Sequence, residues 1–377
     1  MVGGSLDAFI GEVHRKCAAL DGKFDLVCGA FSSSPEKSKK TGEALGLPDN
    51  RVYGSYKEMI EAESKLDANE RMEAVSIVTP NHVHFEPAKL ALENGFHVII
   101  DKPLAFSLDE AKELKTIVNE TGNILALTHT YTGYPMVKEA KHYVASGKLG
   151  NIRKIYVEYP QGWLSTPLEM EGNKQAEWRT DPARSGAGGA IGDIGTHAAN
   201  LAEYVTGLEI TEICADVNIT VKDRNLDDDS AALLKFNNGA SGVLIATQVA
   251  AGEENDLKLR VYGDKAGLEW THTDPNTLLL KPLTDPHQIL RAGTGYLSDA
   301  AASNTRTPPG HPEGYLEAFA NIYVAFHKAV VDYKNGSLKP IDEYDFPDVE
   351  DGVRGMAFVD TMLASNKSDK KWTPFKV

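Results

Sequence analysis

Between Phe24 and about Thr128 the chain alternates short apolar, β-rich runs with stretches of helical spacing, and this alternation constrains the fold more than any other feature. The apolar runs are FDLVCGAF, EAVSIV, HVII and ILALT. Continuous apolar strands separated by helices are typical of a parallel sheet that is covered on both faces. Ser34 and Ser107 each precede acidic residues, which marks two helix starts. The first part is therefore predicted to be a doubly wound α/β domain.

The pattern changes after about Tyr131. A helix, an extended run, a loop with two tryptophans and the helix GDIGTHAANLAEYVTG are followed by several extended runs, in which Asn237-Asn238-Gly239 marks a hairpin. This half is predicted to be an α/β domain with helices on one face of a largely antiparallel, open sheet. Domains usually hold about 100 to 200 residues, so a length of 377 favours two, assigned to 1–129 and 130–377.

Charge and cysteine usage limit the partners and the compartment. The 54 acidic and 39 basic side chains give a net charge of -15 that is spread along the chain, which argues against nucleic acid or an anionic membrane as partner. Cys17, Cys28 and Cys214 have no metal-type spacing and indicate reduced thiols. No apolar run approaches the ~18 residues of a membrane helix, and no signal peptide is visible. We expect a cytoplasmic protein.

The opening stretch MVGGSLDAFIGEVHR is typical of a phosphate-binding turn that leads into a helix from about Phe9. Gly3 and Gly4 would let the backbone approach a pyrophosphate at the helix N-terminus. An ordinary glycine turn is an equally weighted alternative, and the carboxylate of Asp7 is unfavourable beside a phosphate. Little precedes the turn, so the first strand is expected to be truncated by a misassigned or trimmed start.

The residues after FDLVCGAF bear on which dinucleotide is bound. An acidic residue about 20 positions beyond the helix start would hold the ribose diol of NAD, whereas hydroxyl and cationic groups suit the extra phosphate of NADP. Ser32, Ser33 and Lys37 occupy this region and favour NADP over NAD. The alternative is that Ser34 merely caps a helix and that the lysines are solvated.

Three residues carry the candidate chemistry. Lys102 follows the run HVII, at the edge of the sheet where doubly wound folds bind ligands, and a lysine there can take part in proton transfer. Asp193 and His197 are four residues apart, which places a carboxylate and a histidine base on one helix face. The alternatives are a surface lysine, a helix cap and a core histidine. Two ligands without a third make a zinc site a poor interpretation.

Two other patterns are rejected. The segment from Asp223 to Asp227 begins like a calcium loop, but Asp228 replaces the required glycine, and a solvated turn is expected. No G-x-S-x-G elbow precedes a helix, so acyl transfer has no nucleophile.

Taken together, the motifs give the chain a resemblance to the Gfo/Idh/MocA family of nicotinamide-dependent sugar and cyclitol oxidoreductases. Thr79-Pro80-Asn81-His82-Val83-His84 is similar to the loop after the family's fourth strand, and Asp101-Lys102-Pro103 to its Glu-Lys-Pro motif. The stretch from Trp178-Arg179 to Gly192-Asp193-Ile194-Gly195-Thr196-His197 is similar to its second-domain signature.

The resemblance implies a Rossmann domain, then an α/β domain whose open sheet often forms a dimer or tetramer contact. It implies that Lys102 and His197 flank the reacting carbon, with Asp193 assisting. The residues assigned to the cofactor are Gly3, Gly4, Phe9, Ile10, Ser32, Ser33, Lys37, Thr79, Pro80, Asn81, His84, Asp101 and Lys102. Those assigned to a sugar or polyol substrate are Tyr131, Trp163, Trp178, Arg179, Asp193 and His197.

The sequence departs from the family pattern at two places, and two other functions stay open. Asp101 replaces a glutamate, and the loop 129–135 lacks an arginine that many members carry, so the substrate class does not transfer. One alternative is an NAD-dependent glycosidase that oxidises, eliminates and reduces again. The other is a non-catalytic regulator that binds the dinucleotide as a signal.

Overall fold

A computed structural model describes all residues, 1–377, and its contacts divide the chain into two compact units. Unit 1 comprises Met1–Thr128 and Phe319–Val353, and unit 2 comprises His129–Ala318 and Arg354–Val377. Residues 319–353, which the sequence groups with the second domain, thus pack with the first unit. None of the helices is both long enough and apolar enough to span a membrane.

Unit 1 is built on a parallel sheet, as the sequence predicts, and its strand order is β1-β2-β3-β4. Its strands are β1 Val2–Gly3, β2 Ala74–Val78, β3 His97–Ile100 and β4 Leu125–Leu127. Its helices are α1 Phe9–Leu20, α2 Pro35–Ala44, η1 Asp49–Arg51, α3 Tyr56–Glu63, η2 Asn81–Val83, α4 Phe85–Glu93, α5 Leu108–Thr121 and η6 Ile341–Tyr344, with most of α11 Tyr315–Lys334. Ser34 caps α2, and Ser107 with Glu110 forms a capping box on α5.

The sheet continues beyond β1 as isolated bridges. Val2 pairs in parallel with Ala30, and Gly29 pairs in parallel with Val52. Backbone pairing therefore extends to both sides of β1, by strand β2 on one side and by these bridges on the other, as in the interior of a doubly wound sheet.

The run FDLVCGAF forms only these bridges, although the sequence predicts a strand along its length. Val2 and Gly3 are the only β1 residues that reach it, since β1 has two residues. Beside this short strand lies a cavity of about 140 Å³, lined among others by Leu26, Cys28 and Ala74. The ladder on that side of the sheet is thus confined to the end that carries the glycine turn.

Helix α11 belongs to unit 1, where it packs against α1 and against Phe24. The ring of His14 lies edge-on to Phe319 and Tyr323, and Phe24 stacks on Phe326. These ring contacts join parts of the chain that are about 300 residues apart, which explains why sequence order assigned this helix to the other half.

Unit 2 holds a nine-stranded sheet in the order β12-β11-β10-β9-β5-β8-β7-β6-β13. The strands are β5 Ile152–Pro160, β6 Ile210–Asn218, β7 Asp229–Phe236, β8 Ser241–Thr247, β9 Lys258–Gly263, β10 Ala266–Thr271, β11 Thr277–Pro282, β12 Gln288–Arg291 and β13 Thr373–Pro374. The helices are η3 Thr130–Gly133, α6 Pro135–Ala145, η4 Leu168–Met170, α7 Lys174–Arg179, α8 Pro182–Ser185, η5 Ile191–Gly195, α9 Thr196–Thr206, α10 Asp299–Ala302 and most of α12 Val349–Asn366.

All neighbouring strands of this sheet are antiparallel except β5 and β8, which are parallel. The predicted hairpin joins β7 to β8, and its Gly239 has the positive φ of 87° that the turn requires. The prediction of a largely antiparallel open sheet is confirmed.

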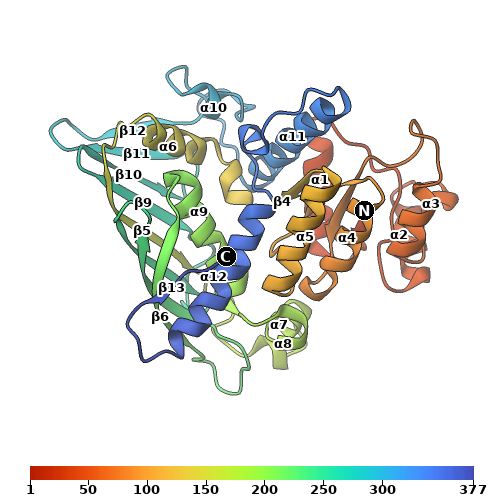
Figure 1. Cartoon of the computed structure of the whole chain (residues 1–377), viewed down its shortest axis with the longest axis horizontal. Coiled ribbons are helices and arrows are strands. Elements are labelled where there is room, and N and C mark those ends of the chain that lie inside the picture. Colours follow the sequence, from red (N-terminus) through yellow and green to blue (C-terminus); the bar gives the residue numbers. More distant parts are fainter. The chain divides into compact units, whose positions relative to one another are not determined.

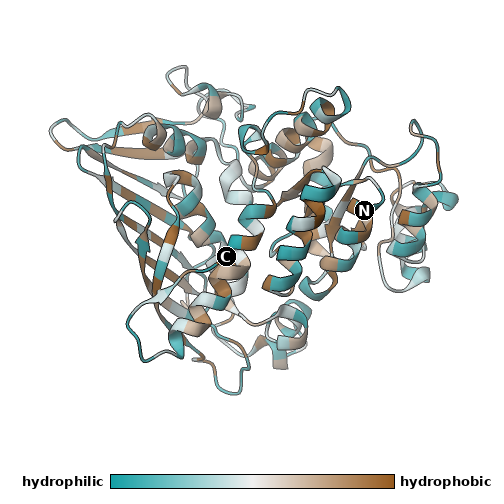
Figure 2. Cartoon of the chain, viewed as in Figure 1, coloured by the Kyte–Doolittle hydropathy of each residue, from teal (hydrophilic) through white to brown (hydrophobic).

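Helices α6 and α9 lie on one face of this sheet (Figure 1). The strands alternate in hydropathy along their length, as Figure 2 shows, and β7 alternates buried and less buried positions. Leu244, Leu259 and Trp270 are fully buried in the core between the sheet and the helices. This core holds β5 and β8 in place, and residues of the candidate site follow the carboxyl ends of these two strands.

Candidate functional site

The glycine turn of unit 1 is shaped for a close approach by a ligand. Gly3 and Gly4 have φ of 79° and 75°, and a Cβ on Gly4 would lie 3.0 Å from the Cα of Gly11 in helix α1. No side chain caps the N-terminus of α1, so its first N–H groups keep their hydrogen-bonding capacity for an anion. The turn and the helix start therefore fit the pyrophosphate of a dinucleotide. Phe9 and Ile10 form the first turn of this helix.

The residues expected to distinguish the ribose of NAD from that of NADP are Ser32, Ser33 and Lys37, which follow the run FDLVCGAF. Ser33 is exposed, while Ser34 is occupied as the cap of α2. The Lys37 ammonium forms an ion pair with Asp7 at 2.8 Å, and both side chains are largely exposed. An exposed ion pair contributes about 0 to 1 kcal/mol, so an incoming phosphate could displace Asp7 at little cost.

Two loops follow the carboxyl ends of β2 and β3. The buried His84 joins them, because its Nδ1 lies 2.7 Å from the Pro103 carbonyl oxygen and its Nε2 lies 2.9 Å from that of Thr79. Burial lowers the pKa of His84, which opposes the protonated form that could donate to both carbonyls. The buried His84 side chain thus bridges the two loops and holds them together. The proposed contact residues Thr79, Pro80 and Asn81 belong to the first loop.

Lys102 stands at the start of the second loop, directly after Asp101. The Asp101 carboxylate accepts hydrogen bonds from the Lys102 backbone N–H at 3.0 Å and from the Thr128 hydroxyl at 2.9 Å. Asp101 therefore fixes the backbone from which the Lys102 side chain extends, by linking the ends of β3 and β4.

In unit 2, Asp193 lies in the π-helical turn η5 and His197 in the first turn of α9. The sequence predicts one regular α-helix here, whereas residues 191–195 form a π-helical turn, in which hydrogen bonds span five residues instead of four. The Nδ1 atoms of His197 and the buried His129 lie 3.1 Å apart, so one imidazole donates to the other. His197 is thereby held at its Nδ1 edge.

The Asp193 carboxylate is held by two neighbours. Gln248 Nε2 donates to its Oδ2 at 2.9 Å, and Arg179 Nε lies 3.3 Å from the same oxygen in an ion pair that is not aligned as a hydrogen bond. The Arg179 guanidinium also lies 4.2 Å from the centre of the Trp178 ring and 5.8 Å from that of Trp163. Three residues predicted to bind substrate are therefore brought together with Asp193.

Amide and phenol groups extend this cluster. Gln161 Oε1 accepts from Trp163 Nε1 at 3.0 Å and from Gln248 at 3.3 Å. The Tyr131 and Tyr159 hydroxyls are hydrogen-bonded to each other, and Tyr159 donates to Asn255 Oδ1 at 2.6 Å. Burial raises the pKa of both phenols, which keeps them protonated. The Tyr131 ring also lies edge-on to His197, with centroids 5.0 Å apart.

The sequence did not identify His129, Tyr159, Gln161, Gln248 or Asn255 as site residues. Gln161 and Gln248 immediately follow β5 and β8, which end together because Pro160 pairs with Thr247 in the one parallel ladder of the sheet. Nothing local in the sequence shows that two strands 80 residues apart run in parallel, so no signal could have found this pair.

The segment from Asp223 to Asp228, predicted to be a solvated turn, is largely buried. Arg224, Asp227 and Asp228 are 7%, 7% and 1% exposed. Asp227 accepts from the N–H groups of Gly189 at 2.6 Å and Ile191 at 2.8 Å, just before Asp193. The prediction was wrong because buried charges are tolerated when they are paired or hydrogen-bonded, and Arg224 pairs both with Asp228, four residues away, and with the distant Glu169.

The burial of Asp227 predicts a pH effect on stability. Burial raises the pKa of Asp227 from 3.8 to about 6, despite the hydrogen bonds from Ile191 and Gly189. The folded state then binds a proton that the unfolded state releases, so this residue's contribution to stability rises as the pH falls from about 6 to about 3.8. As the pH falls from about 6 to about 3.8, we expect the Tm of wild type to rise relative to that of Asp227→Asn, measured by differential scanning fluorimetry. A difference that is independent of pH would contradict the raised pKa.

The chain is similar to known proteins over its whole length. The family described as "Oxidoreductase family, NAD-binding Rossmann fold" matches residues 2–129, and the "GFO/IDH/MocA C-terminal domain" matches residues 137–269. An uncharacterized oxidoreductase of Bacillus subtilis is 33% identical, over 100% of this chain and 96% of its own length. A levoglucosan dehydrogenase of Pseudarthrobacter phenanthrenivorans is 26% identical, over 99% of this chain and 96% of its own.

Among solved structures, an inositol dehydrogenase homolog of Azotobacter vinelandii in complex with NAD+ is similar over the whole chain. It superposes with a TM-score of 0.93 at 34% identity, covering 100% of this chain and 96% of that one. The same homolog in complex with NADH and myo-inositol gives a TM-score of 0.91 at 33% identity, with the same coverage.

Proposed function

The chain belongs to the Gfo/Idh/MocA family of NAD(P)-dependent oxidoreductases, and on this premise we propose that it is a dehydrogenase of sugars, sugar derivatives or cyclitols. The observation that supports this substrate class best is the cluster around Asp193 and His197. Gln161, Gln248 and Asn255 place neutral amides there, and neutral donors and acceptors suit the hydroxyl groups of a polyol.

Each catalytic residue has one role in this proposal. When bound, the nicotinamide supplies the hydride acceptor or donor. His197 takes the proton of the substrate hydroxyl through Nε2, in the tautomer whose Nδ1–H donates to His129. The Lys102 ammonium stabilises the negative charge that develops on that oxygen. Asp193, oriented by Gln248 and Arg179, accepts a hydrogen bond from a substrate hydroxyl.

The aromatic residues are proposed to bind the ring of the substrate. Trp163 is hydrogen-bonded to Gln161, and Trp178 packs against the Arg179 guanidinium, so both indoles are held in place. Indole faces are suited to the apolar faces of sugar and cyclitol rings. Inositol and levoglucosan, named for two relatives, are the first substrates to test.

The glycine turn with the α1 N-terminus is proposed to hold the pyrophosphate, and Thr79, Pro80 and Asn81 the nicotinamide ribose. For the adenosine ribose we propose a preference for NADP over NAD, although the related structure contains NAD+. Ser33 carries no negative charge, and Lys37 is bound only by an exposed ion pair that can be exchanged for a phosphate.

This preference predicts the effect of a single charge. In Ser33→Asp, a carboxylate would accept hydrogen bonds from the ribose diol of NAD and repel the phosphate of NADP. We expect the ratio of the two dissociation constants, measured by calorimetry, to shift at least about tenfold towards NAD. Ser33→Asn, of the same size but neutral, should leave the ratio close to that of wild type. An unchanged ratio in Ser33→Asp would refute the NADP assignment.

One face of the nine-stranded sheet carries α6 and α9, and the opposite face exposes Leu233 on β7. We propose that this open face joins copies of the chain into a homodimer or homotetramer.

A further inference from the structure

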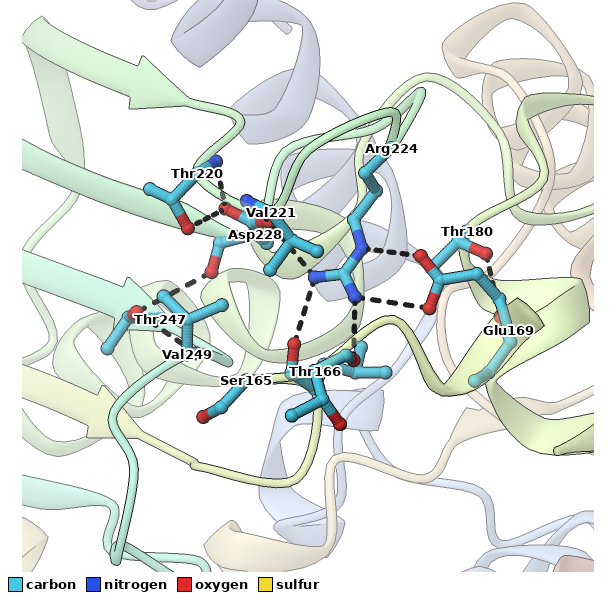
Figure 3. A network of polar contacts seen from close by, with 12 residues as sticks. Ser165, Thr166, Glu169, Thr180, Thr220, Val221, Arg224, Asp228, Thr247 and Val249 are labelled. Carbon is cyan, nitrogen blue, oxygen red and sulfur yellow. Dashed lines mark hydrogen bonds and ion pairs between the residues drawn. The ribbon is translucent and has the colours of Figure 1, made fainter. Parts of the chain in front are cut away.

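A buried arginine links two parts of unit 2 that the proposed function uses separately. Arg224 is 1% exposed in its side chain, and it lies in the connection between β6 and β7. Its partners belong to two segments: the loop 162–170, which carries Trp163, and the turn that ends at Asp228. Figure 3 shows the guanidinium between these partners.

All five N–H groups of Arg224 are satisfied. Nε and Nη2 donate to the two carboxylate oxygens of Glu169, at 2.9 and 3.1 Å. Nη1 donates to the Leu164 carbonyl and to the Asp228 carboxylate, both at 3.0 Å, and Nη2 also donates to the Thr166 carbonyl at 3.2 Å. Burial acts to raise the pKa of Glu169, but the hydrogen bonds from Arg224, a backbone hydrogen bond and the Arg224 charge together outweigh it and lower the pKa.

Glu169, Leu164 and Thr166 span the loop that follows Trp163. Three acceptors of one loop bound to a single rigid guanidinium fix the loop's path, because a planar fork allows few orientations. The loop backbone has a further anchor in the hydrogen bond from Leu164 N–H to the Gln248 carbonyl at 3.1 Å. The loop is thereby tied to the strand end that holds Asp193.

At the other end of this turn, Asp227 holds the start of the helical segment that contains Asp193. Asp227 accepts the N–H groups of Gly189 and Ile191 through its carboxylate, and its carbonyl accepts that of Ala190 at 2.9 Å. The Asp228 carbonyl accepts the Gln248 backbone N–H at 2.8 Å, and the Gln248 side chain donates to Asp193. Neighbouring residues of one turn thus position Trp163 and Asp193.

We propose that residues 224–228 form a positioning brace with two arms, and this inference rests on the proposed function. The loop arm, Arg224, sets the Trp163 loop for substrate binding. The helix arm, Asp227, sets Asp193 and the following His197 for the proton transfer. Neither residue contacts substrate in this account, and each acts through the groups it holds.

Changes in the two arms should affect different kinetic constants. Arg224→Lys keeps the charge but has three donors for five acceptors, so the loop should loosen: we expect KM for the polyol to rise roughly tenfold with kcat within about threefold of wild type. Asp227→Asn presents an amide N–H to one of the two helix N–H groups, so kcat should fall roughly tenfold with KM within about threefold. Arg153→Lys, an exposed arginine of the same unit, is the matched control.

Hydrogen exchange gives a readout that needs no activity. In Arg224→Lys the amides of residues 162–171 should exchange faster than in wild type, while Arg153→Lys should leave them unchanged. If Arg224→Lys does not fold, Glu169→Gln, which removes a charge from the half-buried loop side only, takes its place with the same expected direction. Should wild type oxidise no polyol, the proposed function fails, and exchange in the loop still decides the brace.

Faster loop exchange together with a higher KM would support the brace. Unchanged exchange in Arg224→Lys, or a loss confined to kcat with KM unaltered, would overturn it.

Discussion

Replacing His197 with alanine should lower kcat by about 10²- to 10⁴-fold, which is the range contributed by a positioned general base. Dinucleotide affinity should be retained, because His197 belongs to unit 2 and the proposed cofactor residues to unit 1. Lys102→Ala should lower kcat by about 10²- to 10³-fold, as expected when a donor to a developing oxyanion is removed. Both values are measured as the initial rate of nicotinamide reduction on a polyol that wild type oxidises.

The controls for these variants are surface residues of the same type. His142→Ala on α6 and Lys112→Ala on α5 remove exposed side chains and should keep wild-type kcat. If His197→Ala and Lys102→Ala also keep wild-type kcat, the catalytic assignment is wrong. If only one of them loses activity, the role of the other must be withdrawn.

Gly11→Ala should lower dinucleotide affinity at least about tenfold and reduce Tm, although alanine is the better helix former by about 1 kcal/mol. The reason is steric, since a Cβ at this position would overlap the Cα of Gly4 and approach its carbonyl oxygen to 3.0 Å. The turn would have to move away from α1, so the N–H groups of the helix and of the turn would no longer face the same anion. Calorimetric titration with NAD(H) and NADP(H) measures the loss.

A second helical glycine is the matched control. Gly355 lies within α12 and has open space where its Cβ would stand. Gly355→Ala should therefore keep the affinity and raise Tm slightly. Wild-type affinity in Gly11→Ala would show that the turn does not bind the pyrophosphate.

The fold could be predicted largely because its signals are local. The apolar runs EAVSIV, HVII and ILALT each became a strand, and Asn237-Asn238-Gly239 became the hairpin turn. The run FDLVCGAF did not, because a strand needs a partner, and β1 offers it only Val2 and Gly3. The position of α11 in unit 1 depends on contacts such as His14 with Tyr323, which no local pattern encodes.

The candidate site divides in the same way. The spacing of Asp193 and His197 and the place of Lys102 after an apolar strand made them candidates, and their catalytic roles stay predictions. Gln161 and Gln248 could not be found in this way, since they meet only through the parallel pairing of β5 with β8. The charged turn at Arg224 was misinterpreted as solvated because charge alone predicts exposure, whereas Glu169 and Asp228 make burial possible.

The most direct test of the dehydrogenase assignment is the absorbance of reduced nicotinamide when the purified chain is mixed with NADP+ or NAD+ and a panel that includes myo-inositol and levoglucosan. We expect reduced cofactor to accumulate in step with the loss of a polyol, and we expect none to accumulate in His197→Ala. Release of an aglycone from a glycoside without net reduction would indicate the glycosidase alternative. Dinucleotide binding without turnover of any substrate would indicate a regulator and contradict the central claim.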